Sequence, residues 1–237
     1  MDIRKGKLLL DGRTKKVFAT NRDDLVLLAF KNEATVGDRK EQAKGKNIGR
    51  HACAISSHIF RFLENYHIPT HFVDLPRPAE MAVRKLEMVP LTVWVWNAAS
   101  GNLCKRYGFE KGKPFDVPIV EMYWKNPELH HPMILGDHAQ QLGLAKPSVL
   151  QEFDRLARKI NVVLRDFFTR RNLRLADFVL EFGLANDDIV LGDEISPETC
   201  QFWNVTDDGE VDISRFQIGK RDADDVFSEL GERIEMR

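Results

Sequence analysis

Two apolar segments of this sequence are interrupted by acidic residues, and these acids are the side chains best suited to chemistry. Glu181 lies between Leu180 and Phe182, and Asp193 follows an apolar run that ends at Gly192. A buried carboxylate is costly unless something compensates its charge. Two carboxylates on paired strands can share a divalent cation and place it on a polyphosphate. A plain hairpin with two solvent-exposed acids is the simpler alternative.

The surrounding residues predict the element that would position these acids. Residues 177–183 form one apolar run, and a second approaches residue 191, with the polar stretch 186–188 between them. Short apolar runs separated by a few Asn and Asp residues are typical of two strands joined by a tight turn. The sequence therefore predicts a hairpin that carries both carboxylates.

A glycine turn near the N-terminus is the second candidate for chemistry. Residues 7–10 and 16–19 read as strands on either side of a turn that contains Gly12 and Lys15, and residues 25–30 read as a third strand. Backbone N–H groups of such a turn can hold phosphate oxygens while a lysine neutralises them. Most turns with one glycine are ordinary hairpin turns, so this signal alone is weak.

The remaining elements follow from periodicity and from turn residues. Residues 147–171 have the apolar spacing of a helix, with Ser148 as the predicted N-cap. Pro90 is predicted to separate two strands. The other expected elements are a mobile loop at 33–49, a helix at 52–66, strands at 71–73 and 115–124, a small-residue turn at 97–102, and an amphipathic helix at 215–237.

Composition limits the class of protein. The 237 residues, 43% of them hydrophobic, can bury a sizeable core, and a net charge of −1 gives no field that would attract nucleic acid. No apolar run approaches the roughly 20 residues that span a bilayer. The odd, widely spaced Cys53, Cys104 and Cys200 indicate a reducing compartment and no zinc site. We expect a cytoplasmic protein without a membrane or nucleic-acid partner.

These elements predict an α+β architecture with two lobes. The antiparallel N-terminal lobe, residues 1–90, would cover a nucleotide, and an α/β second lobe, residues 91–237, would hold the metal and the second substrate. ATP would lie in the cleft between the glycine turn and the acidic hairpin. Protein kinases use the same logic, with a glycine-rich loop over the phosphates and carboxylates that hold magnesium.

Several blocks of this chain, in order, resemble the SAICAR synthetase family (phosphoribosylaminoimidazole-succinocarboxamide synthase). The resemblance covers nearly the whole chain. The matching blocks are Gly12 to Phe18, Lys85 to Pro90, Asn97 to Ala99 with Lys105 and Arg106, His131 to Ile134, Asp177 to Gly183, and Asp193 to Pro197. The family is an ATP- and magnesium-dependent ligase that joins an aminoimidazole ribonucleotide carboxylate to aspartate, and it often forms oligomers. The resemblance implies the family's two-lobed fold and a homo-oligomer.

The resemblance also implies roles for individual residues. Lys15 and Asp193 would act in catalysis, and Asp193 with Glu181 would hold the metal. Glu87 and Met88 would meet the adenine between the lobes. The residues implied to bind ATP are Gly12, Arg13, Thr14, Lys15, Val17, Lys85, Glu87, Met88, Glu181 and Asp193.

The chain departs from the family pattern where the family binds its carboxylate substrate. Three positions that usually carry cations hold Trp96, Val179 and Gln201. Each charge-assisted hydrogen bond to a phosphate contributes roughly 1.5–3 kcal/mol, so their loss should weaken a phosphorylated substrate strongly. The residues assigned to this pocket are Trp96, Asn102, Arg106, Asp177, Val179 and Gln201.

These departures lead to a hypothesis of altered specificity. The chain would be an active ATP-dependent carboxylate–amine ligase whose acid lacks the 5′-phosphate, or carries a flat group that stacks on Trp96, in specialised metabolism. The amine would be aspartate or another amino acid. The alternatives are the ordinary purine enzyme, an ATP-binding protein without ligase chemistry, and a small-molecule kinase.

Overall fold

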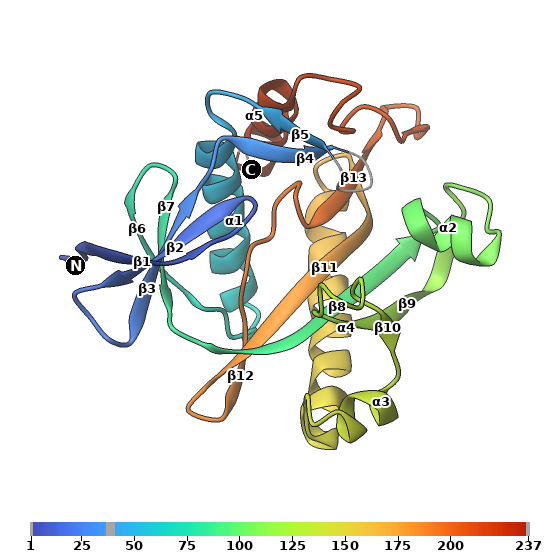
Figure 1. The fold of residues 1–237 in the computed structure, drawn as a ribbon. Coiled ribbons are helices and arrows are strands. Elements are labelled where there is room, and N and C mark those ends of the chain that lie inside the picture. The colour runs from blue at the N-terminus through green and yellow to red at the C-terminus, as the bar shows by residue number, and fades with distance from the viewer. Residues whose placement is uncertain (1, 37–40, 236–237) are drawn as a thin grey trace.

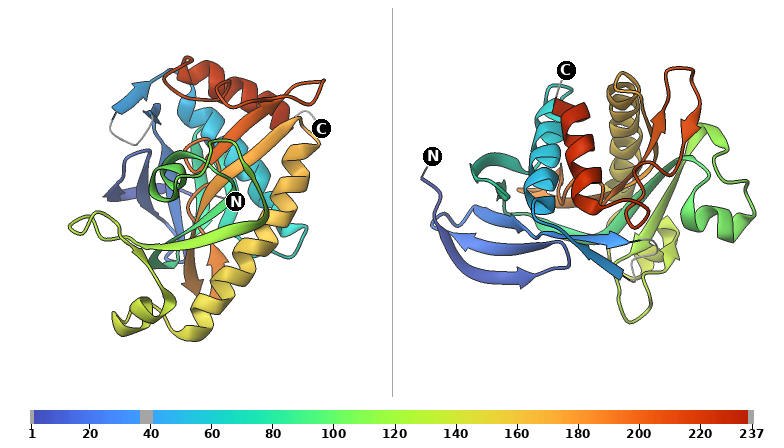
Figure 2. Two further views of the ribbon diagram at one scale, coloured as in Figure 1. Left: turned by 90° about the vertical axis from the view of Figure 1, so that its right-hand side faces the viewer. Right: turned by 90° about the horizontal axis from the view of Figure 1, so that it is seen from above.

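The computed structural model describes residues 2–36 and 41–235. Two antiparallel sheets form two lobes, and the three long helices lie on one side of the strands (Figures 1 and 2). This agrees with the α+β architecture that the sequence predicts. The long strands β8 and β11 run side by side through the middle of the second lobe (Figure 1).

The N-terminal sheet has the strand order β1-β2-β3-β7-β6. Its first two strands form the hairpin whose turn is the predicted glycine turn. The third strand is buried on both faces. Leu28 and Phe30 lie in the main hydrophobic cluster, and Leu25 and Leu27 lie in a second, smaller cluster. The strands are β1 (Lys5–Asp11), β2 (Lys15–Thr20), β3 (Leu25–Phe30), β6 (Phe72–Arg77) and β7 (Glu80–Arg84).

The second sheet has the order β10-β9-β8-β11-β13-β14, and β12 pairs with the far end of β11. The hairpin of β11 and β12 is the predicted acidic hairpin, although β12 ends before Asp193. Its strands are β8 (Glu87–Ala98), β9 (Pro114–Trp124), β10 (Met133–Ile134), β11 (Leu173–Ala185), β12 (Asp188–Leu191), β13 (Cys200–Val205) and β14 (Val211–Asp212).

Three long helices cover the sheets. The apolar stripe predicted for α4 (Pro147–Thr169) is buried, and it packs on β11 and β8. Helix α1 (Ile48–Glu64) packs against α5 (Ala223–Glu235) and beneath the N-terminal sheet. Two short helices, α2 (Gly101–Tyr107) and α3 (Gly136–Gln141), lie at the edge of the second lobe.

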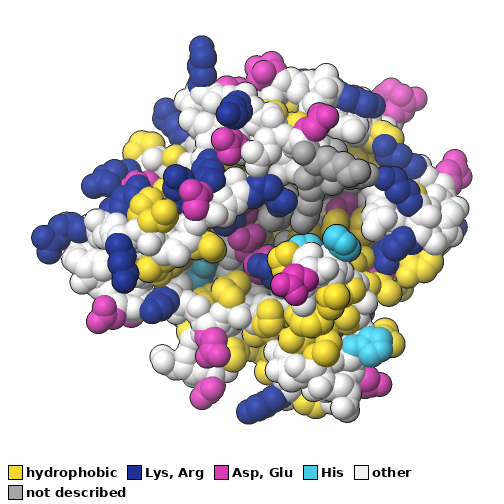
Figure 3. Space-filling model, viewed as in Figure 1, with side chains coloured by type: hydrophobic (Ala, Val, Ile, Leu, Met, Phe, Trp, Pro, Cys, Tyr) yellow, Lys and Arg dark blue, Asp and Glu magenta, His cyan; other side chains and the backbone are white. Residues whose placement is uncertain are grey.

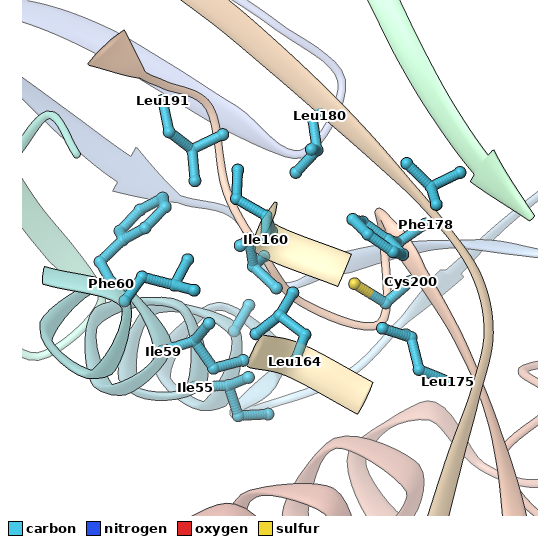
Figure 4. Packing of buried hydrophobic residues seen from close by; sticks show 14 of the residues in the cluster. Ile55, Ile59, Phe60, Ile160, Leu164, Leu175, Phe178, Leu180, Leu191 and Cys200 are labelled. Carbon is cyan, nitrogen blue, oxygen red and sulfur yellow. The ribbon is translucent and has the colours of Figure 1, made fainter. Parts of the chain in front are cut away.

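One hydrophobic cluster joins the two lobes. Ile55 and Phe60 from α1 meet Ile160 from α4, and Phe178 from β11 closes the cluster (Figure 4). All four side chains are fully buried. Burial of a side chain of this size contributes roughly 1.5–3 kcal/mol, so the cluster fixes the position of each sheet relative to the other.

Several sequence predictions are corrected by the structure. The predicted mobile loop at 33–49 contains the hairpin of β4 (Glu33–Val36) and β5 (Glu41–Lys44), and then the start of α1. Residues 37–40 of this loop lie outside the described part of the chain, as do residues 236–237 of the predicted tail helix. That helix begins at Ala223 and not at residue 215.

Two further corrections concern prolines. Pro90 does not separate two strands, because β8 runs through it. The β8–β11 register shifts between Glu181 and Gly183, and a strand tolerates proline at such an irregularity. The N-cap of α4 is Lys146, with Pro147 as the first helical residue, so Ser148 is not the cap.

The division of the chain at residue 90 stays a prediction. β8 crosses that position, and the main hydrophobic cluster contains residues from both sides of it. Within residues 2–36 and 41–235, no helix is both long enough and apolar enough to cross a membrane.

Candidate active site

The side chain of Lys15 joins the N-terminal glycine turn to the segment that follows the acidic hairpin. Its ammonium nitrogen lies 2.7 Å from Oδ1 of Asp193 and also donates to Oε1 of Glu194. Thr14 Oγ1 donates to the same Glu194 oxygen over 3.2 Å. Residues about 180 positions apart in the sequence therefore meet between the two lobes.

The glycine turn is closed by its own backbone. Gly12 N–H donates to the carbonyl of Lys15 over 3.0 Å, and Lys31 Nζ donates to the carbonyl of Gly12 over 2.6 Å. A Cβ atom at Gly12 would lie only 2.9 Å from the Lys15 carbonyl oxygen, so the turn needs glycine here. This closure directs the Lys15 side chain toward the second lobe.

The local charges keep Lys15 and Asp193 ionised. Burial lowers the pKa of Lys15, but the charges of Asp193 and Glu194 outweigh it, and the net pKa is raised. Burial raises the pKa of Asp193, yet the charge and hydrogen bond of Lys15 outweigh burial and leave that pKa lowered. The pair is thus an ammonium against a carboxylate, as required for binding phosphate and metal.

Glu181 lies beside this pair on β11. Its carbonyl accepts the N–H of Gly192 over 2.9 Å, so the residue before Asp193 is held against Glu181. Lys125 Nζ lies 2.6 Å from Glu181 Oε2. Burial, and then the charge of Asp193, raise the pKa of Glu181, while Lys125 opposes them. The two acids are close enough to influence each other.

The backbone of Asp193 is in the left-handed region, with φ of 58°. A non-glycine residue there is uncommon, although Asp tolerates it better than most, and it costs of order 1–3 kcal/mol. Helix α1 holds the residues that follow, because Ile195 N–H donates to the buried Ser56 hydroxyl of that helix over 3.0 Å. This conformation turns the chain sharply at the site.

The segment at 85–88 passes over the end of the acidic hairpin. Leu86 and Met88 lie against Gly183 and Gly192, where added Cβ atoms would fall within 2.8–3.4 Å of their side chains. Met88 is 42% exposed, and Lys85 and Glu87 are also exposed. A planar ligand could contact this segment next to the acids.

The other residues implied to bind ATP lie on the glycine turn and the following strand. Arg13 is exposed on the turn, and its charge acts on Glu198. Val17 on β2 is half-buried and packs against the main core. The face of the molecule in Figure 3 is hollowed near its centre, with side chains of both charges around the hollow.

Four of the residues assigned to the second substrate lie on neighbouring strands of the second sheet. Trp96 of β8 pairs in register with Asp177 of β11, which pairs with Gln201 of β13. Val179, two positions along β11, points to the same face and is nearly buried. Ser100 Oγ and Trp94 Nε1 both donate to the carboxylate of Asp177, the latter over 3.1 Å.

Trp96 does not offer an open surface for a flat ligand. Its side chain is 1% exposed and stacks on Trp94, with ring centroids 4.7 Å apart. Its Nε1 donates to Glu121 over 3.0 Å. The prediction that a substrate stacks on Trp96 is therefore wrong, because Trp94 and Glu121 already satisfy the indole.

Arg106 and Asn102 come from the short helix α2. Arg106 Nη2 lies 2.6 Å from Glu121 Oε2, and the Tyr123 hydroxyl donates to the same oxygen over 2.8 Å. Burial and this carboxylate raise the pKa of Tyr123, so the phenol stays protonated. Asn102 is exposed at the start of the helix.

Two residues of these clusters carry no role in the sequence prediction. Glu194 is 2% exposed and holds the glycine turn, and Glu121 is 9% exposed and holds both Trp96 and Arg106. Glu194 could have been noticed as a second acid between apolar Leu191 and Ile195. Glu121 lies within a predicted strand, in an alternating stretch that is also typical of strands with a solvent-exposed acid.

The carboxylates of Asp193 and Glu181 fit magnesium better than zinc. Hard oxygen donors suit magnesium, which usually takes one or two protein carboxylates and completes its shell with phosphates and water. Among the described residues, no cluster of three or more His, Cys, Asp or Glu side chains could hold a metal by itself. A site of two carboxylates plus a polyphosphate is consistent with that result.

Comparison with known proteins identifies the family. A family model described as SAICAR synthetase matches residues 8–229. The phosphoribosylaminoimidazole-succinocarboxamide synthase of Prosthecochloris aestuarii is 40% identical over 98% of this chain and 99% of its own length. A solved structure titled SAICAR synthetase in complex with ADP has a TM-score of 0.89 and 37% identity, covering 98% of each chain. The Pyrococcus horikoshii SAICAR synthetase structure has a TM-score of 0.85 and 38% identity, covering 94% of this chain and 98% of its own.

These relatives overturn the hypothesis of altered specificity. Curated proteins that share about 40% identity over nearly their full length are named phosphoribosylaminoimidazole-succinocarboxamide synthase. The protein of Chlorobium chlorochromatii is a second example, with 40% identity over 98% of this chain. They support the alternative given with the hypothesis. With a matching family model, full-length relatives and solved structures of the same fold, this chain belongs to the SAICAR synthetase family and is an ATP-dependent ligase that forms carbon–nitrogen bonds.

Proposed function

We propose that this chain catalyses the SAICAR synthetase reaction of purine biosynthesis. It joins the carboxylate of the aminoimidazole carboxylate ribonucleotide to the amino group of L-aspartate, and ATP is converted to ADP and phosphate. The observation that carries the proposal is the Lys15 ammonium held at 2.7 Å from Asp193 between the lobes, with Glu181 beside them. The full-length similarity to curated synthases supports it.

A carboxylate is a poor electrophile, so the reaction needs an activated acid. An oxygen of the carboxylate attacks the γ-phosphorus of ATP, which forms an acyl phosphate and releases ADP. The uncharged amine of aspartate then attacks the acyl carbon, the nitrogen loses a proton, the C–O bond breaks, and inorganic phosphate leaves. The protein contributes mainly positioning and neutralisation of phosphoryl charge.

The residues divide this work between the two lobes. Gly12, Arg13 and Thr14 cover the phosphates with backbone and side-chain donors, and Lys15 neutralises the γ-phosphate. Glu87 and Met88 contact adenine from the exposed segment above the hairpin. Lys85 and Val17 complete the nucleotide site.

Asp193 and Glu181 would hold magnesium with the phosphates of ATP. The metal would supply charge neutralisation at the phosphoryl oxygens. The side chain of Asp193 is 24% exposed and that of Glu181 is 16% exposed, so both can reach a ligand in the cleft.

The sheet face around Asp177 receives the ribonucleotide acid. Arg106 from α2 supplies a guanidinium beside this face, and Asn102 and Gln201 offer neutral donors. Asp177 is 7% exposed and accepts a hydrogen bond from Ser100, so its role is to orient the side chains around the substrate.

The reaction is tested with purified protein, ATP, magnesium, the ribonucleotide acid and L-aspartate. ADP release that requires both the acid and aspartate, with the succinocarboxamide product seen by mass spectrometry, is the expected result. ADP release that does not need the amine would indicate a kinase instead. A purine auxotroph that the gene fails to rescue, together with no product in vitro, would refute the proposal. The homo-oligomer stays a prediction. Light scattering on the purified protein measures the oligomeric state directly.

A further inference from the structure

We propose that Glu194 is a positioning residue for Lys15, and that this pair, more than the Lys15–Asp193 pair, holds the glycine turn over the phosphates. The inference rests on the proposed function, since it concerns the same ATP site. Asp193 and Glu194 are adjacent in the sequence, and they would divide two tasks. Asp193 serves the metal, and Glu194 serves the lysine.

The burial of the two carboxylates supports this division. The side chain of Glu194 is 1% exposed, whereas that of Asp193 is 24% exposed. A carboxylate that is nearly sealed from solvent cannot easily gain a hydrated metal ion, because magnesium gives up its water reluctantly. The more exposed Asp193 can exchange Lys15 for such an ion.

The hydrogen bonds of Glu194 are those of a fixed anchor. One oxygen accepts from Lys15 Nζ and from Thr14 Oγ1, and the other accepts from Ser196 Oγ over 2.6 Å. Ser196 is itself fully buried. The Thr14 and Lys15 side chains of the glycine turn therefore attach to one carboxylate, whose other oxygen is held by Ser196.

The need for such an anchor follows from the lysine side chain. A free lysine loses much rotamer freedom when its ammonium is confined to one position. A carboxylate that confines it before the nucleotide arrives removes this cost from binding. Protein kinases show the same arrangement, in which a lysine that meets the phosphates is held by a glutamate and a separate aspartate holds magnesium.

The anchor also has to remain when the metal binds. Once Asp193 coordinates a cation, its charge is no longer available to Lys15. Glu194 then becomes the carboxylate that keeps the ammonium beside the phosphates. Removing its charge should weaken nucleotide binding through Lys15 and not through a general loss of structure.

The test is a double-mutant cycle on equilibrium binding of ADP with magnesium, measured by titration calorimetry on the full chain. The four proteins are wild type, Glu194→Gln, Lys15→Gln and the double variant. We expect Glu194→Gln to weaken binding about tenfold or more in the wild-type background, the value of a charged hydrogen bond. In the Lys15→Gln background, Glu194→Gln should weaken ADP binding less than about twofold. A twofold change in affinity is about the deviation seen between independent sites, so it counts as no effect.

Glu198→Gln is the matched control, because Glu198 is a half-buried glutamate on the same loop. Its carboxylate accepts hydrogen bonds from Thr35 N–H over 2.8 Å and from Thr35 Oγ1 over 2.7 Å. It therefore holds the β4–β5 hairpin and makes no hydrogen bond to Lys15. Its effect on ADP binding should be the same in both backgrounds. Ser196→Ala, which removes one bond to Glu194, replaces Glu194→Gln in the cycle if the latter does not fold.

Each outcome has a distinct meaning. A Glu194→Gln cost that is equal in both backgrounds shows a structural role and overturns the inference. Unchanged binding in Glu194→Gln overturns it as well. Wild-type protein that binds no ADP would instead refute the proposed function, so the two failures are distinguishable.

Discussion

Gly183 is the position where one methyl group should disturb the nucleotide site most selectively. A Cβ atom there would lie 2.8 Å from Leu86 Cβ, 3.0 Å from the Glu87 carbonyl oxygen and 3.0 Å from Met88 Sδ. Ordinary contacts begin at 3.4 Å, so the 86–88 segment would have to move by about 0.6 Å. This segment is the proposed adenine contact, and Gly183→Ala therefore tests that assignment.

The size of the effect follows from two opposing terms. Overpacking against backbone and a Cβ atom costs about 1–3 kcal/mol, and the entropy gained by replacing glycine returns about 0.4–1 kcal/mol. The net loss of about 1–2 kcal/mol should lower the melting temperature by roughly 2–8 °C for a chain of this size. A shift of the adenine contact should weaken ADP binding about tenfold, since small misplacements of a binding group are expensive.

Gly192→Ala is the matched control on the same hairpin. Its Cβ would meet Met88 Cε and Sδ at 3.3 Å, the end of a flexible side chain that can move aside. Calorimetric melting should show a change of less than about 0.5 kcal/mol in this variant, and ADP binding should weaken less than in Gly183→Ala, because the backbone of the 86–88 segment is not displaced. Equal damage from both variants, or no effect of Gly183→Ala on ADP binding, would refute the argument.

Three further substitutions test other parts of the structure. Asp193→Asn should reduce kcat about 100-fold and abolish the magnesium dependence of ADP binding; retained dependence would place the metal elsewhere. Glu229→Gln should lower the free energy of unfolding by about 1–3 kcal/mol at pH 7, because three arginines lie 2.7–2.9 Å from this carboxylate. The pKa of Glu229 is lowered, since these hydrogen bonds outweigh burial. The loss of unfolding free energy should therefore be full above pH 4.5, the ordinary value, and shrink as the pH falls through the lowered pKa of the folded state. A loss that does not change with pH in urea unfolding would contradict this. Asn161→Ala should cost about 2–3 kcal/mol because it leaves the buried Asn97 amide without its reciprocal partner at 2.8 and 2.9 Å, and an unchanged melting point would refute it.

Local sequence was sufficient to predict the elements that carry the site. The glycine turn between strands, the acidic hairpin and the helix at α4 all depend on turn residues and on apolar spacing, which act over a few positions. Asn186 and Asp187 adopt positive φ in the hairpin turn, as such residues commonly do. These features could be read without knowledge of the tertiary structure.

Other features depend on contacts between distant residues. The polar stretch after Glu33 looks like a loop, yet it forms a hairpin because Glu198 and Asp224 bind its backbone from far along the chain. Glu194 and Glu121 resemble surface acids until the fold brings Lys15 and Arg106 to them. Their ion pairs could not be predicted, because the partners that compensate their charges lie on other elements.

The error about specificity has a physical origin of the same kind. The hypothesis counted cations at fixed positions and treated Trp96 as a new surface for a ligand. In the structure the indole is sealed, and its N–H satisfies Glu121 together with Arg106. Where the family has an arginine, Trp96 donates a hydrogen bond to Glu121, and Arg106 pairs with the same carboxylate. The substitution thus alters the contacts within this face and does not open space for another ligand. A lost charge in a pocket indicates a new substrate only when the neighbouring groups show that the vacated space is open to a ligand.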